Sequence, residues 1–78
     1  MYKQMKFTQL QFDQIHRGYV QGVDFAIYAR HKYSWQQMHQ IRLGLIGKVD
    51  VTKYLDDSIS AERMKEIRLA LQQSIRKV

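Results

Sequence analysis

The fold follows from one stretch of the sequence, Ser34-Trp35-Gln36-Gln37-Met38-His39-Gln40-Ile41-Arg42-Leu43-Gly44-Leu45-Ile46-Gly47-Lys48-Val49. Its apolar stripe has steps of three, four and four residues, and consists of Met38, Ile41, Leu45 and Val49. This spacing places the four side chains on one face of an α-helix. The same spacing occurs on both sides of the stretch, in Phe12, Ile15, Tyr19 and Val23 and in Met64, Ile67, Leu71 and Ile75. We therefore expect three amphipathic helices, each of about three to four turns.

The three stripes are parts of a repeat of 26 residues. When the chain is aligned with itself at that interval, chemically similar residues recur in order, and Met-x-x-Ile-Arg-Leu-x-Leu occurs at 38–45 and 64–71. A unit of this size cannot bury its own apolar face, whereas three stacked units can. The sequence therefore predicts one helical-repeat domain over 1–78, with units 7–32, 33–58 and 59–78.

Hydroxyl residues mark the expected starts of the three helices, at Thr8, Ser34 and Ser60. Their side chains can accept hydrogen bonds from backbone N–H groups that have no partner within the first helical turn. Gln11 and Gln37 follow three residues later and complete a capping box, whereas Arg63 breaks this pattern in the third unit.

The ends of the first two helices are marked as well. Gly22 and Gly47 stand where a left-handed C-cap residue is expected. Asp24 and Asp50 follow them and are typical of N-cap residues. Each aspartate therefore predicts the start of a second, shorter helix.

The short helices are expected over 25–30 and 51–56, with Tyr28 and Tyr54 as their inward anchors. The third unit lacks these elements, so its helix is expected to run on toward Val78. The sequence thus predicts an all-α fold of long, short, long, short and long helices. Such helices would form either a compact bundle or a very short solenoid.

Composition narrows the class of protein. The chain has 78 residues, no cysteine, no proline and a net charge of +6. Without cysteine, disulfides and thiolate metal sites are excluded. No apolar run approaches the roughly 20 residues needed to span a bilayer, and residues 1–10 do not resemble a signal peptide. We expect a cytoplasmic protein with no membrane association.

The residues that carry chemistry form no catalytic pattern. The three histidines, His16, His31 and His39, include no pair with the i, i+4 spacing of a helical metal site. No serine lies in a nucleophile elbow, and the glycines form no phosphate-binding loop. The sequence therefore predicts a protein that is not an enzyme and has no metal or other cofactor.

Basic and aromatic residues gather in the middle third of the chain, where residues 27–52 carry four basic side chains and one acidic side chain. A cationic turn with aromatic rings can bind phosphates and stack on bases, and it can equally bind a protein. The candidate partner-binding residues are Arg30, Lys32, Tyr33, Trp35, Arg42 and Lys48.

Each of these residues also has a structural interpretation. Tyr33 can act as a hydrophobic staple before a helix, and Trp35 can pack between two helices. Arg42 and Arg68 lie beside the apolar stripe, where their stems can cover the core edge while their charged groups reach water.

A resemblance bears on function. The stretches 37–45 and 49–55 resemble a short repeat of the form QMxxIRxGLxxGxDVxxYA. Such repeats occur in poorly characterised proteins of phages, plasmids and conjugative elements of Gram-positive bacteria. The resemblance implies a protein of a mobile element that acts in the cytoplasm of a bacterial host cell, and it supplies no catalytic residues.

These observations favour a non-enzymatic protein-interaction module, such as an inhibitor or modulator of a host protein like a defence nuclease. The alternative is a basic accessory protein that binds nucleic acid. Self-assembly is a third hypothesis, because Leu43, Ile46 and Leu69 lie away from the apolar stripe and can form a dimer patch. The chain is therefore expected to be a monomer or a homodimer.

Overall fold

The computed structural model of the protein describes residues 6–76. The predicted continuation of the last helix to Val78 and the first five residues of the predicted domain lie outside this range. The elements are α1 (Gln9–Gln21), η1 (Phe25–Ile27), α2 (Trp35–Ile46), η2 (Val51–Lys53) and α3 (Ala61–Arg76), where η denotes a 3₁₀-helix. The described residues contain no strand, which confirms the predicted all-helical fold.

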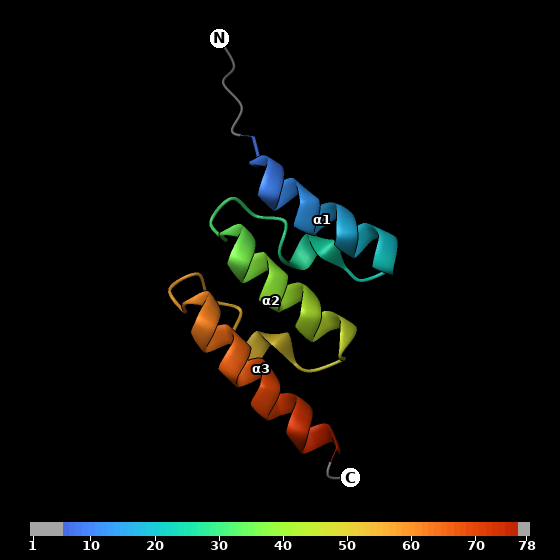
Figure 1. Cartoon of the computed structure of the whole chain (residues 1–78), viewed down its shortest axis with the longest axis vertical. Coiled ribbons are helices and arrows are strands. Elements are labelled where there is room, and N and C mark those ends of the chain that lie inside the picture. The colour runs from blue at the N-terminus through green and yellow to red at the C-terminus, as the bar shows by residue number, and fades with distance from the viewer. Residues whose placement is uncertain (1–5, 77–78) are drawn as a thin grey trace.

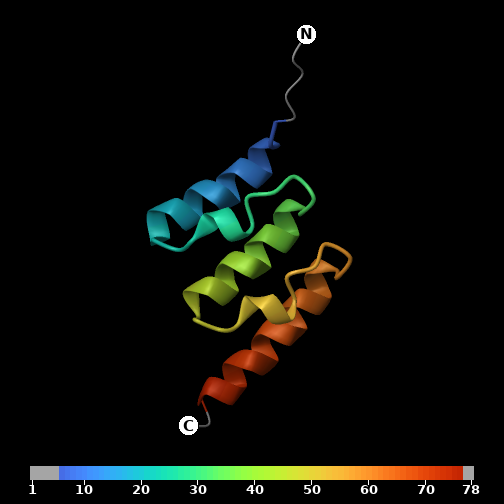
Figure 2. The ribbon, with the colours of Figure 1, turned by 180° about the vertical axis from the view of Figure 1, so that it is seen from behind.

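The three long helices lie side by side in one row, with α2 in the middle (Figures 1 and 2). They run in the same direction, so that their starts lie along one edge of the molecule and their ends along the other (Figure 1). α2 packs against both neighbours, while η1 contacts α1 and η2 contacts α2. The segments that contain η1 and η2 return the chain from one edge to the other.

The predicted capping boxes are present at the starts of α1 and α2. The Thr8 hydroxyl accepts from the backbone N–H of Gln11 at 3.1 Å, and the Gln11 side chain accepts from the backbone N–H of Thr8 at 2.9 Å. Ser34 and Gln37 form the same pair of bonds at 3.1 and 2.8 Å. A cap of this kind stabilises a helix by about 1 kcal/mol.

The two capping glutamines also connect neighbouring helices, a role that the sequence did not indicate. The Gln11 amide donates to the Tyr33 carbonyl at 2.7 Å. The Gln37 amide donates to the carbonyl of Ile59 at 2.8 Å and to that of Asp57 at 2.9 Å. Each of these amides therefore fixes the backbone that leads into the next long helix.

The tyrosines of the return segments are inward anchors, as predicted, and both are fully buried. The Tyr28 hydroxyl donates to the Gln14 carbonyl at 2.7 Å, and the Tyr54 hydroxyl donates to the Gln40 carbonyl at 2.8 Å. Burial raises the pKa of Tyr54 to about 12, so this hydroxyl keeps its proton and remains a donor.

Glycines make room for these hydroxyls. A Cβ at Gly18 would overlap the Tyr28 hydroxyl, and a Cβ at Gly44 would overlap that of Tyr54. Ala70 occupies the corresponding position of α3, so α3 cannot receive a tyrosine in the same way. The absence of a side chain at the two glycines is therefore a packing requirement.

The helix ends agree only partly with the prediction. Gly22 has a φ of 77° and is the expected left-handed C-cap of α1. The prediction for Gly47 is wrong, because its φ is −78° and the left-handed residue is Lys48, with a φ of 60°. Asp50 caps η2 by accepting from the Thr52 N–H, whereas Asp24 makes no such bond at η1.

The predicted short helices over 25–30 and 51–56 are wrong in length, since η1 and η2 have three residues each. The reason is a turn of the backbone directly after each buried tyrosine. The Arg30 N–H donates to the Tyr28 carbonyl at 2.7 Å, and the Asp56 N–H donates to the Tyr54 carbonyl at 2.9 Å. A continuing α-helix would require each N–H to donate to the carbonyl four residues earlier.

Among the residues that the structure describes, the core contains eight apolar side chains: Tyr28, Tyr33, Met38, Ile41, Val49, Val51, Tyr54 and Met64. The prediction that Phe12 and Tyr19 belong to it is wrong, because they are 54% and 68% exposed. Ile75, at the far end of the third stripe, is also exposed. α1 has a neighbouring long helix on one side only, so this part of its apolar stripe stays uncovered.

Candidate protein-interaction surface

The structure does not bring the predicted partner-binding residues together. Arg30 and Lys32 are exposed in the turn before α2, and Trp35, the first residue of α2, is half-buried. Lys48 lies beyond the other end of this helix of 12 residues, a separation of about 18 Å along the helix axis. The basic side chains therefore do not form one continuous patch.

The aromatic rings of the turn are used within the fold. Tyr33 is only 2% exposed, and Lys32 places its ammonium 5.3 Å from the centre of this ring, within the range of a cation–π contact. His31 stacks on Phe7 with the ring centres 4.2 Å apart. Trp35 borders a shallow hollow of about 210 Å³ between α2 and α3.

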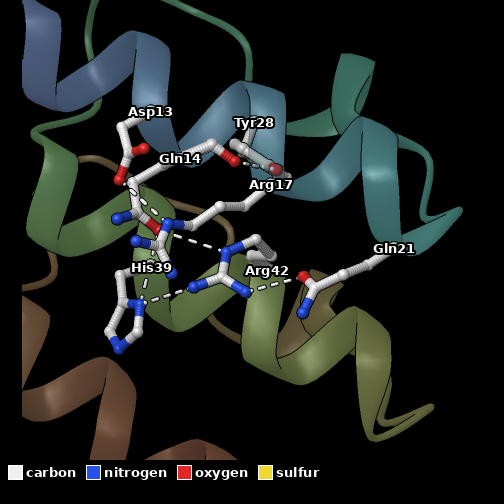
Figure 3. A network of polar contacts seen from close by, with 7 residues as sticks. All are labelled: Asp13, Gln14, Arg17, Gln21, Tyr28, His39 and Arg42. Atoms are coloured by element: carbon white, nitrogen blue, oxygen red, sulfur yellow. Dashed lines mark hydrogen bonds and ion pairs between the residues drawn. The ribbon is translucent and has the colours of Figure 1, made fainter.

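Arg42 is 4% exposed and lies between α1 and α2. Its Nε donates to the side-chain oxygen of Gln14 at 3.1 Å, and its Nη1 donates to that of Gln21 at 2.7 Å (Figure 3). The prediction that the charged group reaches water is therefore wrong. Its partners are neutral side chains of α1, and a buried cation is tolerable only when it is hydrogen-bonded in this way.

His39 completes this cluster, with its Nδ1 at 2.9 Å from Nη2 of Arg42 (Figure 3). A guanidinium can only donate, so Nδ1 must accept and the ring proton must sit on Nε2. Burial lowers the pKa of His39, and the charges of Arg42, Arg68 and Arg17 lower it further. His39 is therefore held in its neutral form.

Arg68 makes the corresponding contact between α2 and α3, and it is buried too. Its Nε donates to the Gln40 side chain at 3.0 Å, and its Nη1 donates to Gln72 at 3.0 Å. The expected exposure of its charged group is therefore wrong as well. The pairs Gln14–Arg42 and Gln40–Arg68 occupy positions 26 residues apart, and the recurrence of glutamine at 14 and 40 was the signal for them in the sequence.

The outer part of α1 carries an exposed row of rings formed by Phe12, His16 and Tyr19, which we call the aromatic row. The ring centres of Phe12 and His16 are 6.3 Å apart, and those of His16 and Tyr19 are 6.5 Å apart. Tyr19 meets Phe25 edge-on at 6.2 Å. The three rings of α1 are four and three residues apart, so they lie on one face of the helix.

The positions that correspond to this row on α2 face the preceding helix. Arg42 stands 26 residues after His16 and contacts α1, and Met38 stands 26 residues after Phe12 and is fully buried. The aromatic row therefore occupies the face of α1 on which a further helix would pack if one preceded it.

At the opposite end of the molecule from the aromatic row, the outer face of α3 is polar. The outer face of α3 consists of Arg63, Glu66, Ala70 and Gln73, all of them exposed. Arg63 and Glu66 form an ion pair at 2.9 Å. The two ends of the molecule thus differ in character, one aromatic and the other charged.

The hypothesised dimer residues differ in their exposure. Leu43 is half-buried, while Ile46 and Leu69 are exposed on α2 and α3. Ile46 borders an open hollow of about 520 Å³ at the ends of α1 and α2, which Lys48 also lines. Among the described residues, no group of three histidine or carboxylate side chains is placed to hold a metal ion.

Comparisons of the chain with family models, with curated proteins and with solved structures each returned no match. Over residues 6–76, no helix is both long and apolar enough to cross a membrane. The aromatic row places two large exposed rings, Phe12 and Tyr19, on one face of α1, whereas an ordinary solvated helix face is polar.

Proposed function

We propose that the protein is a non-enzymatic protein-interaction module and that the aromatic row is its binding surface. The observation that carries this proposal is the exposure of Phe12 and Tyr19 on the same face of α1. Scattered apolar residues are common on protein surfaces, but adjacent exposed rings are typical of interaction sites. Aromatic side chains also dominate the energetics of protein interfaces.

The module is a single domain built from three units of a 26-residue repeat, 7–32, 33–58 and a shorter last unit, 59–78, stacked as a very short solenoid. The recurrence of the glutamine–arginine and tyrosine–glycine contacts at this interval supports the assignment. In such stacks each unit covers its neighbour, so a terminal unit exposes the face that an inner unit buries. The first unit would therefore present a surface already shaped to receive a helix.

The partner that fits this surface carries a helix with side-chain acceptors. Within the molecule, α1 offers the acceptors Gln14 and Gln21 to Arg42 of α2. A helix with similar side chains in a host protein would meet the same requirement. Together with the resemblance to mobile-element repeats, this supports an inhibitor or modulator of a host protein such as a defence nuclease.

Binding of nucleic acid by a basic accessory protein is the second candidate. The net charge of +6 and the exposed Arg30 and Lys32 support it. The burial of Arg42 and the distant position of Lys48 weigh against it, because phosphate binding depends on basic groups that line one surface.

The test is capture of a stoichiometric protein partner from a Gram-positive bacterial lysate by the tagged chain. We expect Phe12→Gln with Tyr19→Gln to abolish capture, because the row loses both of its large rings. Leu10→Gln is the matched control, since Leu10 is exposed on α1 and lies about 160° around the helix from Phe12 at 3.6 residues per turn, and glutamine is a good helix former.

Two results would contradict the proposal. One is capture that survives the loss of both rings. The other is recovery of nucleic acid alone, in an amount that Arg30→Gln with Lys32→Gln reduces and that falls steeply as salt is raised.

A further inference from the structure

We propose that the aromatic row binds the outer face of α3 in a second copy of the chain, so that copies associate head to tail. This inference rests on the proposed function, because it names the partner of the same surface. Its basis is the pair of contacts that already join α1 to α2 and α2 to α3.

Both internal interfaces follow one pattern of side chains. A glutamine of the earlier helix accepts from an arginine 28 residues further on, Gln14 from Arg42 and Gln40 from Arg68. Glu66 stands 26 residues after Gln40, and His16 stands 26 residues before Arg42. A third interface of the same kind therefore pairs Glu66 of one copy with His16 of the next.

This third pair is complementary in charge and hydrogen bonding. The acceptor is here the carboxylate of Glu66 instead of a glutamine amide, and the donor is the imidazole of His16 instead of an arginine. Both side chains are exposed. Glu66 already pairs with Arg63, but an ion pair between two exposed side chains contributes little to stability. The carboxylate can therefore exchange this partner for His16.

The neighbouring positions are compatible as well. Gln11 donates to the Tyr33 carbonyl and Gln37 to the Ile59 carbonyl. Arg63 stands 26 residues after Gln37 and is also a donor, so it can bond the carbonyl at the start of the next copy's first helix. The hydrogen bonds that fix the backbone before α2 and before α3 thus have a counterpart at the proposed interface.

Packing at the centre of the proposed interface differs from packing at the two internal interfaces, and the two differences compensate each other. Ala70 has the Cβ that Gly18 and Gly44 lack, so no tyrosine can sit on α3 as Tyr28 sits on α1. The row carries Phe12 and Tyr19, which are larger than the residues 26 positions later, Met38 and Leu45. The added ring volume fills the room that a tyrosine takes at the internal interfaces.

An interface of this kind joins two different surfaces, so each added copy leaves one row and one α3 face uncovered. Growth then continues until a ring closes or a filament forms. Row-to-row pairing, by contrast, stops at a dimer. Repulsion between chains of net charge +6 opposes growth and is screened at moderate salt.

The experiment is sedimentation of the purified chain and of two variants at moderate salt. We expect the mass of the wild type to rise with concentration. Phe12→Gln with Tyr19→Gln removes the row, and Glu66→Lys removes the acceptor on α3, so each variant alone should be monomeric. An equimolar mixture should form a discrete dimer, because one variant keeps the α3 face and the other keeps the row.

A wild type that stays monomeric would overturn the inference, as would continued association of Glu66→Lys, which indicates row-to-row pairing. Far-ultraviolet circular dichroism checks that the variants remain helical. Adding His16→Glu to Glu66→Lys should restore association by reversing the pair. The proposed function fails separately, since capture of a foreign protein through the row is measured in the lysate with the Leu10→Gln control.

Discussion

At the scale of single residues, neutral side chains rather than carboxylates surround the buried arginines. Gln14 and Gln21 accept from Arg42, and Gln40 and Gln72 accept from Arg68. An amide oxygen satisfies a guanidinium without adding a second buried charge, whose desolvation costs on the order of several kcal/mol. The arrangement keeps the positive charge uncompensated, and that charge acts on His39.

The environment of His39 makes stability depend on pH. Burial and the nearby arginines lower its pKa in the folded state, whereas the unfolded value is about 6.5. The unfolded chain therefore binds more protons below that pH, so the stabilisation by neutral His39 is complete above it. This stabilisation is lost as the pH falls toward the lower, folded-state pKa.

Urea unfolding between about pH 5 and 8, the range where histidine titrates, measures this dependence. We expect the midpoint to fall at acidic pH in the wild type and to fall less in His39→Asn. Asparagine has an acceptor close to the position of Nδ1 and does not titrate, and both proteins retain His16 and His31. An equal fall in the two proteins would contradict the assignment of this effect to His39.

At the scale of elements, each return segment is held to the helix before it by one tyrosine and one glycine. Tyr28 reaches over Gly18 to the Gln14 carbonyl, and Tyr54 reaches over Gly44 to the Gln40 carbonyl. The short 3₁₀-helices need this anchor, because three residues form too few hydrogen bonds to persist alone.

The anchor predicts an unusual effect of alanine in a helix. Alanine normally stabilises a helix over glycine by about 1 kcal/mol. At Gly18 it would overlap the Tyr28 hydroxyl, so we expect Gly18→Ala to lower the free energy of unfolding by about 1–3 kcal/mol. Chemical denaturation measures the change.

Two further variants make this prediction specific. Tyr28→Phe removes the hydroxyl, so the double variant should lose less stability than the sum of the single changes. Ala70→Gly, at the exposed equivalent in α3, should cost only the propensity difference of about 1 kcal/mol. A stabilising effect of Gly18→Ala would mean that the hydroxyl moves aside at no cost.

At the scale of the whole molecule, α2 is the element on which the other two long helices depend. It packs against both α1 and α3, which lie on opposite sides of it (Figure 1). Opening either outer helix breaks one interface between long helices, whereas opening α2 breaks two. Local stability should therefore differ between elements rather than follow one global transition.

Amide hydrogen exchange tests this order. We expect the slowest exchange at the buried residues of α2, such as Ile41 and Arg42, and faster exchange in α1 and α3. The reference is the interior amides of α3, a longer helix of 16 residues that has a single helical neighbour among the described elements. Equal protection of all three helices would show that the molecule opens only as a whole.

The sequence predicted most of the local structure but less of the packing between helices. The all-helical fold, the two capping boxes and the inward tyrosines are confirmed, because each depends on residues close together in the chain. The burial of Phe12 and Tyr19 was wrong, because periodicity shows which residues share a face but not whether a neighbour covers it. The 26-residue organisation stays a proposal.

The candidate surface was predicted least well. Arg42 was expected to be exposed because charged residues usually are, and its acceptor Gln14 lies 28 residues earlier in the chain, beyond the reach of local patterns. Phe12 and Tyr19 of the aromatic row were placed on the apolar stripe, because their spacing is that of its other members. Of the six predicted partner-binding residues, Arg30, Lys32 and Lys48 are exposed, Trp35 is half-buried, and Tyr33 and Arg42 are buried.

The common direction of the three long helices gives the molecule a permanent electric polarity. Each helix carries a charge equivalent of about half an elementary charge, positive where it starts and negative where it ends. In an antiparallel bundle these charges cancel, but here they add along the two edges (Figure 2). Arg30 and Lys32 lie in the turn just before α2 begins, on the positive edge. An acidic surface therefore attracts the positive edge. The protein rotates to present that edge before the two surfaces come into contact.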